Sequence, residues 1–252
     1  MSGRGHPGRQ HLDRHLRASQ DLLARLDADP ADHPRLDELQ HWQRCRLRET
    51  YADLKAQPKF EMACVFFLEE LYGGRDMRER DRQLERVLPV MSRMLPDHLL
   101  YAVGDAMKLQ WMSMDLDARL SRCLQAPLDQ AEYARAYRRM AAWDERVEQI
   151  ELIRALGRLL QRTVRKPMMY RLVRIMHGPA VAAGFGKLQE FLAEGLDAFA
   201  AMGDDATEFV DTVVERETTA LNHMRQGADW PFREWIGDGP EVGRPKSEVG
   251  GR

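Results

Sequence analysis

Few residues in this sequence have the types and the spacing that a metal site or an active site requires. Glu38 and His41 form one Glu-x-x-His tetrapeptide. A carboxylate-bridged di-metal site in a helical bundle uses two such tetrapeptides and a glutamate from each of two further helices. No second copy is found, because His98, His177 and His223 each lack a glutamate three residues before them. The sequence therefore argues against a di-metal site.

Three other histidines have positions from which they could bind a ligand. His11 and His15 are four residues apart, so they share one helix face and could grip a metal ion. They lie in a polar segment without a third ligand, so we predict surface histidines. His177 lies in an apolar neighbourhood before Gly178. A haem or other ligand contact is conceivable there, but a core or helix-capping histidine is the simpler interpretation, since the helix dipole favours an imidazolium at a helix C-terminus.

Motifs for phosphate binding and nucleophilic catalysis are not found. The sequence has no Gly-x-x-x-x-Gly-Lys-Ser/Thr phosphate loop and no Gly-x-Ser-x-Gly elbow. Cys64 lies beside Phe66 and Phe67, where we predict an inert core thiol and not a nucleophile. We therefore predict no catalytic residue, no metal and no cofactor, and the sequence favours a non-enzymatic protein.

The composition is that of a globular protein with a charged surface. The 252 residues are 44% hydrophobic and 31% charged, and the formal net charge is -2. Nucleic-acid-binding proteins usually carry a basic excess, so this balance argues against a nucleic-acid partner. The longest uncharged stretch is shorter than the roughly 20 residues that span a bilayer, and no signal peptide is visible. Three cysteines without metal-like spacing indicate reduced thiols, so we expect a cytoplasmic protein with no membrane partner.

Apolar residues recur at spacings of three and four almost everywhere, which is typical of amphipathic helices. We therefore predict an all-α fold, an antiparallel multi-helix bundle with shorter helices packed across it. One long helix is expected over residues 129–165, with Val147 and Ile150 on its inward face. Asp32 and Asp205 are expected to cap the helices that follow them.

The predicted organisation is one helical domain between two flexible ends. Residues 1–8 are assigned to a disordered N-terminus, residues 9–226 to the domain, and residues 227–252 to a flexible tail. Residues 9–57 form a possible N-terminal helical hairpin. Trp230, Phe232 and Trp235 could hold the start of the tail against the domain.

Residues 66–72 read Phe-Phe-Leu-Glu-Glu-Leu-Tyr, and Gly73-Gly74-Arg75-Asp76 and Arg80-Asp81 follow. This segment resembles the signature of the FFLEELY motif proteins, a family of mostly proteobacterial helical proteins. The seven-residue string is present without a departure. The resemblance implies a bacterial helical protein, and it brings no activity and no functional residues.

The same segment has two interpretations from its residues alone. Glu69 and Glu70 cannot both face apolar surroundings unpaired, because a buried lone carboxylate costs several kcal/mol. The nearby arginines could form a Glu–Arg–Asp network that holds the loop, which is the simpler interpretation. The alternative is a ligand pocket that uses side chains at the end of the string and just after it: Tyr72, Arg75, Asp76, Arg80 and Asp81.

Two functional hypotheses follow from these observations. The first is a non-enzymatic helical protein that acts by binding a protein partner or by self-association into a homo-oligomer. The alternative is a protein that binds a small molecule or a cofactor such as haem or a metal in a pocket between its helices, and such a protein could be an enzyme.

Overall fold

The computed structural model describes residues 7–67, 97–166 and 186–237. Helices and turns make up these three ranges, and no strand occurs in them, which confirms the predicted all-α fold. The main helices are α1 (Pro7–Ala28), α2 (Leu36–Thr50), α4 (Pro58–Val65), α6 (Asp97–Arg122), α7 (Gln130–Met140), α8 (Trp143–Val164), α11 (Gly186–Met202) and α12 (Ala206–Arg225). Short helical elements are η1 (Pro30–Asp32), α3 (Ala52–Lys55), η3 (Gly203–Asp205) and α13 (Arg233–Ile236).

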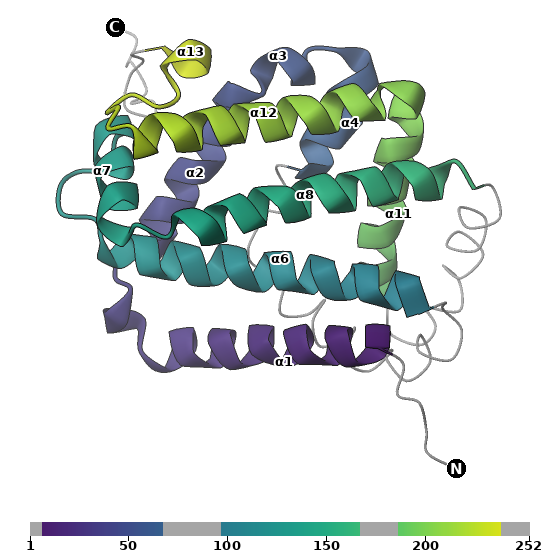
Figure 1. Cartoon of the computed structure of the whole chain (residues 1–252), viewed down its shortest axis with the longest axis horizontal. Helices are drawn as coiled ribbons and strands as arrows, with labels where there is room; N and C mark the ends of the chain where they lie inside the picture. The colour runs from purple at the N-terminus through teal and green to yellow at the C-terminus, as the bar shows by residue number, and fades with distance from the viewer. Residues whose placement is uncertain (1–6, 68–96, 167–185, 238–252) are drawn as a thin grey trace, which may run out of the picture.

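Four long helices lie side by side in the order α1, α6, α8, α12 (Figure 1). Helices α6, α8 and α12 alternate in direction, because the end of α6 meets the start of α8 and the end of α8 meets the start of α12. Arg119 accordingly pairs with Glu145 at 2.8 Å. Helix α11 packs across this layer and also contacts α4 (Figure 1).

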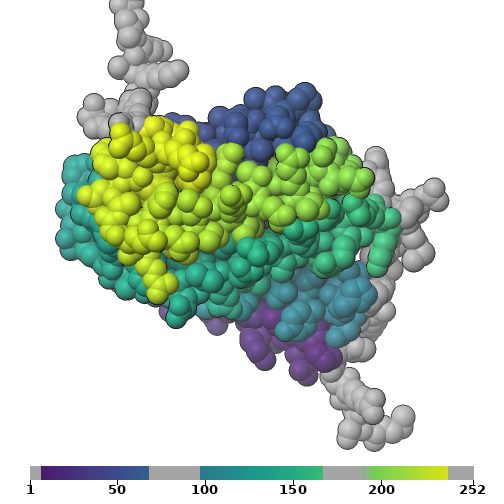
Figure 2. Space-filling view, turned by 45° about the horizontal axis from the view of Figure 1, so that its top comes forward, coloured from purple at the N-terminus to yellow at the C-terminus, as the bar shows by residue number. Residues whose placement is uncertain are grey.

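Helix α1 runs parallel to α6 along one edge of the molecule (Figures 1 and 2). Near the start of both helices, the Gly8 N–H donates to Asp97 Oδ1 at 3.0 Å. Near their ends, Arg122 forms an ion pair with Asp32. A Cβ at Gly104 would overlap the His11 ring, so the absence of a side chain there lets the two helices approach closely.

The core contains an apolar stripe of helix α2. Leu39, Trp42, Leu47 and Tyr51 are all buried in one cluster with residues of α4, α7, α11 and α12. Phe66 and Phe67, the first two residues of the FFLEELY string, pack against this cluster. The remaining residues of the string lie outside the described ranges.

The long helix expected over residues 129–165 is two helices, so that prediction was wrong. Helix α7 ends at Met140 and α8 begins at Trp143. Between them Ala141 has a left-handed backbone with φ 53°. Neither glycine nor proline marks this corner in the sequence. Ala142 is buried with Met112 and Leu116 of α6, so tertiary packing sets the position of the break.

The inward face of α8 also differs from the prediction. Val147 is 45% exposed, whereas Arg146, Gln149 and Ile150 are buried. The reason is that Arg146 has polar partners inside the protein, among them Gln149 Oε1 at 2.9 Å. A pattern based on apolar residues gives no reason to place an arginine on the inward face.

Neither of the two expected aspartate caps is formed. Asp32 lies within η1, and Arg35 occupies the N-cap position of α2. Asp205 does occupy the N-cap position of α12, but its side chain makes no capping hydrogen bond and lies 3.4 Å from Lys59 Nζ. A side-chain cap does form at α7, where the Asp129 carboxylate accepts from the Glu132 N–H at 2.7 Å.

Residues 227–237 belong to the predicted flexible tail, but they lie against the domain. Phe232 is 1% exposed and belongs to the core cluster. Trp235 packs against the same cluster, while Trp230 is exposed. Among the helices in the described ranges, none is long and apolar enough to cross a bilayer.

Candidate functional site

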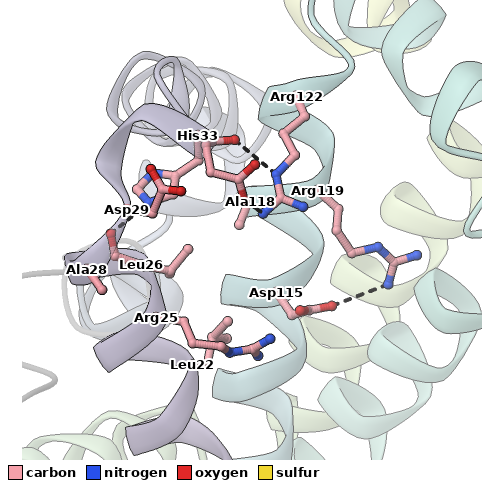
Figure 3. A pocket seen from close by; sticks show the side chains of 11 residues that line it. Leu22, Arg25, Leu26, Ala28, Asp29, His33, Asp115, Ala118, Arg119 and Arg122 are labelled. Atoms are coloured by element: carbon pink, nitrogen blue, oxygen red, sulfur yellow. Dashed lines mark hydrogen bonds and ion pairs between the residues drawn. The ribbon is translucent and has the colours of Figure 1, made fainter.

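One pocket in the described part of the chain lies between the C-terminal ends of α1 and α6. Its volume is about 420 Å³, within the roughly 300–1,000 Å³ typical of small-molecule sites. Helix α1, the η1 connection and α6 supply its walls (Figure 3). Because the two helices run in parallel, their ends lie at the same side of the molecule and the connection after α1 closes the pocket. We call it the α1–α6 pocket.

The α1–α6 pocket combines apolar side chains with charges of both signs. Leu22, Leu26, Ala28 and Ala118 supply apolar surface. The charged side chains that line it are three arginines and three aspartates: Arg25, Arg119, Arg122, Asp29, Asp32 and Asp115. Arginines in the last turn of a helix interact favourably with the partial negative charge there. The pocket therefore carries no excess of positive or negative charge. Electrostatic complementarity favours a ligand that carries one charge of each sign.

Four of these six charges already have partners. Arg119 pairs with Asp115 at 3.3 Å and forms two hydrogen bonds of 2.8 Å with Glu145. The hydrogen bond with Glu145 raises the pKa of Arg119. Arg122 donates to the carbonyl oxygen of Asp32 at 3.0 Å and pairs with its carboxylate. These contacts fix the walls of the pocket.

The other two charges are available to a ligand. Arg25 and Asp29 are exposed, and neither forms an ion pair with another residue of the described ranges. Figure 3 shows Arg25 beside Leu22 on α1 and Asp29 beyond the end of that helix, next to His33. His33 itself is held in place, because its Nε2 donates to the Leu26 carbonyl oxygen at 2.8 Å.

A second polar site is a small cavity in the core between α2, α7, α8 and α12. Its volume is about 40 Å³, and its polar lining residues are Arg46, Tyr133, Tyr137, Arg146, Gln149 and Glu217. Arg46 Nη1 donates to Glu217 Oε1 at 2.5 Å, and the Tyr51 hydroxyl donates to the same oxygen at 2.8 Å. Burial alone would lower the pKa of Arg46, but the Glu217 carboxylate raises it, so the guanidinium stays charged.

On the α6 side, Asp117 connects this cluster to α2. Its Oδ1 accepts from Gln43 Nε2 at 3.0 Å and lies 3.7 Å from Arg146 Nη2. Burial raises the pKa of Asp117 despite the neighbouring Arg146. Burial likewise raises the pKa of Tyr137, so that its hydroxyl keeps its proton.

All six predicted site residues lie outside the described ranges. Residues 68–96 contain Tyr72, Arg75, Asp76, Arg80 and Asp81, and residues 167–185 contain His177. Neither interpretation of that segment is tested, and the ligand pocket there stays a prediction. The two sites above were missed by sequence reasoning, which searched for known motifs and found none at either place.

His11 and Cys64, two residues with predictions from the sequence, lie within the described ranges. His11 is not the surface residue that we expected: its ring stacks on Tyr101 with centroids 4.0 Å apart, and Nε2 donates to Asp105 Oδ1 at 2.8 Å. Within the described ranges no group of three His, Cys, Asp or Glu side chains could hold a metal ion. Cys64 is buried, and burial raises the pKa of its thiol to about 11, which agrees with an inert thiol.

The large apolar side chains exposed in the described ranges are scattered. Met62, Tyr101, Val147 and Trp230 come from α4, α6, α8 and the segment after α12. No single patch is defined by them. Partner binding and self-association therefore stay predictions.

The fold and its pockets define an all-α protein with a ligand-sized pocket between two parallel helices. The chain belongs to the family described as a domain of unknown function (DUF8198), whose model matches residues 22–231. Every residue that lines the α1–α6 pocket lies inside that match. No curated protein and no solved structure matches the chain.

Proposed function

We propose that this protein is a non-catalytic binding protein and that the α1–α6 pocket binds a small dipolar ligand. The ligand class is a short apolar peptide with free ends, or a molecule with the same arrangement of charges. The observation that carries the proposal is one pocket that presents apolar surface together with two charges of opposite sign, Arg25 and Asp29, that form no ion pair among the described residues. The resemblance to the FFLEELY motif proteins, and with it a bacterial source, also remains a proposal that residues 66–72 alone support.

The charges of the pocket explain why a dipolar ligand is favoured over a simple anion. A carboxylate would pair with Arg25. A second negative charge would meet Asp29 and the C-terminal end of α1, both of which favour a cation. An ammonium group of the ligand would interact favourably with Asp29 and the C-terminal end of α1. An apolar body of the ligand would pack against Leu22, Leu26 and Ala118.

The test is a thermal-denaturation series with three versions of the tripeptide Ala-Leu-Ala. One has free ends, one is N-acetylated and therefore lacks the cation, and one is C-amidated and lacks the anion. We expect the free peptide at ten times its Kd to raise Tm by about 3 °C. Each blocked peptide at the same concentration should raise Tm by less.

Single variants assign the two charges of the ligand to the two residues. Arg25→Gln should abolish the difference in Tm shift between the free peptide and the amidated peptide. Asp29→Asn should abolish the difference in Tm shift between the free peptide and the acetylated peptide. Arg14→Gln is the matched control, because Arg14 is an exposed arginine on the same helix that does not line the pocket. If none of the three peptides shifts Tm at millimolar concentration, or if all three act equally in every variant, the proposal is wrong.

A further inference from the structure

The chain segment that follows α12 is held against the domain through its main chain. This segment, residues 228–237, contacts side chains of α7 at both of its ends. Arg138 Nη1 donates to the Ala228 carbonyl oxygen at 2.9 Å, and Gln130 Nε2 donates to the Gly237 carbonyl oxygen at 3.1 Å. Hydrogen bonds from side chains to a main chain are a common way for a folded protein to hold a short peptide.

Gln130 is the centre of this contact. It is 5% exposed, and in the described part of the chain both of its polar atoms bond to the segment. Its Nε2 reaches Gly237, and its Oε1 accepts from the Phe232 N–H at 3.2 Å. Because a buried amide without partners is destabilising, α7 carries a buried side chain that is suited to this segment.

Phe232 anchors the segment in the core. Its side chain is 1% exposed, and its ring centroid lies 6.2 Å from that of Trp42 and 5.9 Å from that of Tyr133. The guanidinium carbon of Arg46 lies 4.4 Å from the same ring centroid. A buried aromatic anchor with main-chain hydrogen bonds beside it has the anatomy of a bound peptide. We call the side chains that receive it the segment-binding site: Trp42, Arg46, Gln130, Tyr133 and Arg138.

Gly227 joins the segment to α12. Its φ is 96°, and the Ala228 N–H donates to the His223 carbonyl oxygen at 2.9 Å, so the chain turns back on the helix there. Glycine adopts positive and negative φ with similar ease. The joint therefore permits a second conformation in which the segment is directed away from its own domain.

We propose that the segment-binding site also takes the 228–237 segment of a second copy of this chain, so that the protein forms a domain-swapped homodimer. Reciprocal exchange repeats each contact of the monomer between two chains and requires no new surface. The segment lines no part of the α1–α6 pocket, so this proposal is independent of the dipolar ligand. A short tether gives the segment an effective concentration of about 1 mM at its own site. The dimer therefore forms near that protein concentration, and the monomer predominates at micromolar concentration.

The first experiment mixes two full-length variants with complementary defects. Phe232→Ala removes the anchor of the segment and leaves the segment-binding site intact. Gln130→Met removes two main-chain contacts of the site and leaves the segment intact. The intact segment of one chain then docks best on the intact site of the other, so the mixture should contain a heterodimer. Each variant by itself should stay monomeric.

The loss of two buried hydrogen bonds sets the concentration at which the heterodimer should form. It weakens docking of the segment within the Gln130→Met chain about thirtyfold. We therefore expect the heterodimer at about 30 µM of each chain, in contrast to the roughly 1 mM needed by the wild type. Native mass spectrometry resolves the heterodimer from the two homodimers by mass, and circular dichroism checks that both variants are folded.

Trp230→Ala is the matched control for the mixture. Trp230 is an aromatic residue of the same segment but is 42% exposed, so its replacement leaves Phe232 docked. Trp230→Ala mixed with Gln130→Met should remain monomeric at the same concentration. Monomers alone in the Phe232→Ala mixture would overturn the proposal. A heterodimer of equal abundance in the control mixture would overturn it as well, because association would then not depend on the anchor.

The second experiment uses the wild type and needs no variant, so it decides if Phe232→Ala does not fold. The protein is refolded from urea at about 1 mM and at about 10 µM, and its mass is measured by size exclusion with light scattering. We expect a dimer only after refolding at the higher concentration. Folded monomer brought quickly to that concentration should stay monomeric, because exchange requires the segment to leave its site. Monomer in all samples, or an equal amount of dimer without refolding, would contradict the proposal.

Discussion

At the scale of single residues, the unusual feature of this protein is a charge network inside its core. Arg46 and Glu217 come from α2 and α12, which are distant in the sequence and meet at one ion pair of 2.5 Å. Glu217 also accepts from the Tyr51 hydroxyl. Removing one partner of such a pair leaves a buried charge without compensation, which costs more than the intact pair contributes.

We therefore expect Glu217→Gln to lower the free energy of unfolding by about 2 kcal/mol, somewhat below the 3–5 kcal/mol of fully buried pairs because Glu217 is partly exposed. Glutamine keeps an acceptor for Arg46 but loses the charge. Urea denaturation followed by circular dichroism measures the change. Glu215→Gln, on the exposed face of the same helix, is the matched control and should stay within about 0.5 kcal/mol of the wild type. Equal stabilities of the two variants would show that the ion pair contributes nothing.

The apolar part of the core could be predicted from the sequence, and its polar part could not. Leu39, Trp42 and Leu47 follow helical spacing, so their burial can be predicted from the sequence. Arg46 lies at the same spacing, seven residues after Leu39 and four after Trp42. An arginine in that position is usually assigned to the surface, since burial of a charge is favourable only where a partner exists. The partner, Glu217, is 171 residues away, and a single sequence carries no signal that joins the two.

At the scale of elements, the corner between α7 and α8 is the clearest departure from local sequence preference. The Ala141-Ala142 pair favours a continuous helix, because alanine has the highest helix propensity. Ala141 nevertheless takes the left-handed conformation, which costs roughly 1–2 kcal/mol for a residue with a Cβ. Burial of Ala142 against α6 and the packing of α8 beside α12 offset that cost. The existence of helical structure over residues 129–165 was therefore predictable, and its break was not.

This conformation makes Ala141→Gly a stabilising substitution. Glycine adopts positive φ without strain, although it loses more entropy on folding, so we expect a net gain of about 0.5–1 kcal/mol. The measurement is the unfolding midpoint in urea. Ala155→Gly, at an exposed position within α8, is the matched control and should lose about 1 kcal/mol. Destabilisation by both substitutions would mean that Ala141 carries no strain in solution.

At the scale of the whole molecule, the order and direction of the helices follow from contacts that no local pattern encodes. An antiparallel arrangement was predicted, and it holds for α6, α8 and α12. Helix α1 is parallel to α6, because the α1–α6 connection is long enough to include α2 and α4 before the chain returns. That parallel pair brings the two helix ends together and forms the α1–α6 pocket, so the site is a product of topology and not of a sequence motif.

The loop between α6 and α7 links this architecture to pH through Glu132. Its side chain is 1% exposed, accepts from the Gln125 N–H at 2.6 Å, and pairs with Arg135 at 3.1 Å and with Arg139. Burial works to raise the pKa of Glu132, but the hydrogen bonds from Gln125 and Arg135 outweigh it, so the pKa lies below its ordinary value of 4.5. The folded protein thus binds this proton less readily than the unfolded chain does.

The contribution of Glu132 to stability decreases as the pH falls. The stabilising contribution of Glu132 is fully present above the unfolded pKa of 4.5 and is lost as the pH falls through the lower folded pKa. Wild type and Glu132→Gln should therefore differ in unfolding free energy by about 1–2 kcal/mol at pH 7, and the difference should shrink toward pH 3. Comparing the two proteins isolates Glu132 from the opposite contribution of Asp117, whose pKa is raised by burial.

Urea denaturation at several pH values between 7 and 3 provides the measurement. Glu151→Gln, at an exposed position on α8, serves as the control and should follow the wild-type curve within about 0.5 kcal/mol at every pH. A difference between wild type and Glu132→Gln that stayed constant down to pH 3 would show that the carboxylate charge is not what holds the α6–α7 loop. In that case the shape of the side chain, and not its ionisation, would account for the contact.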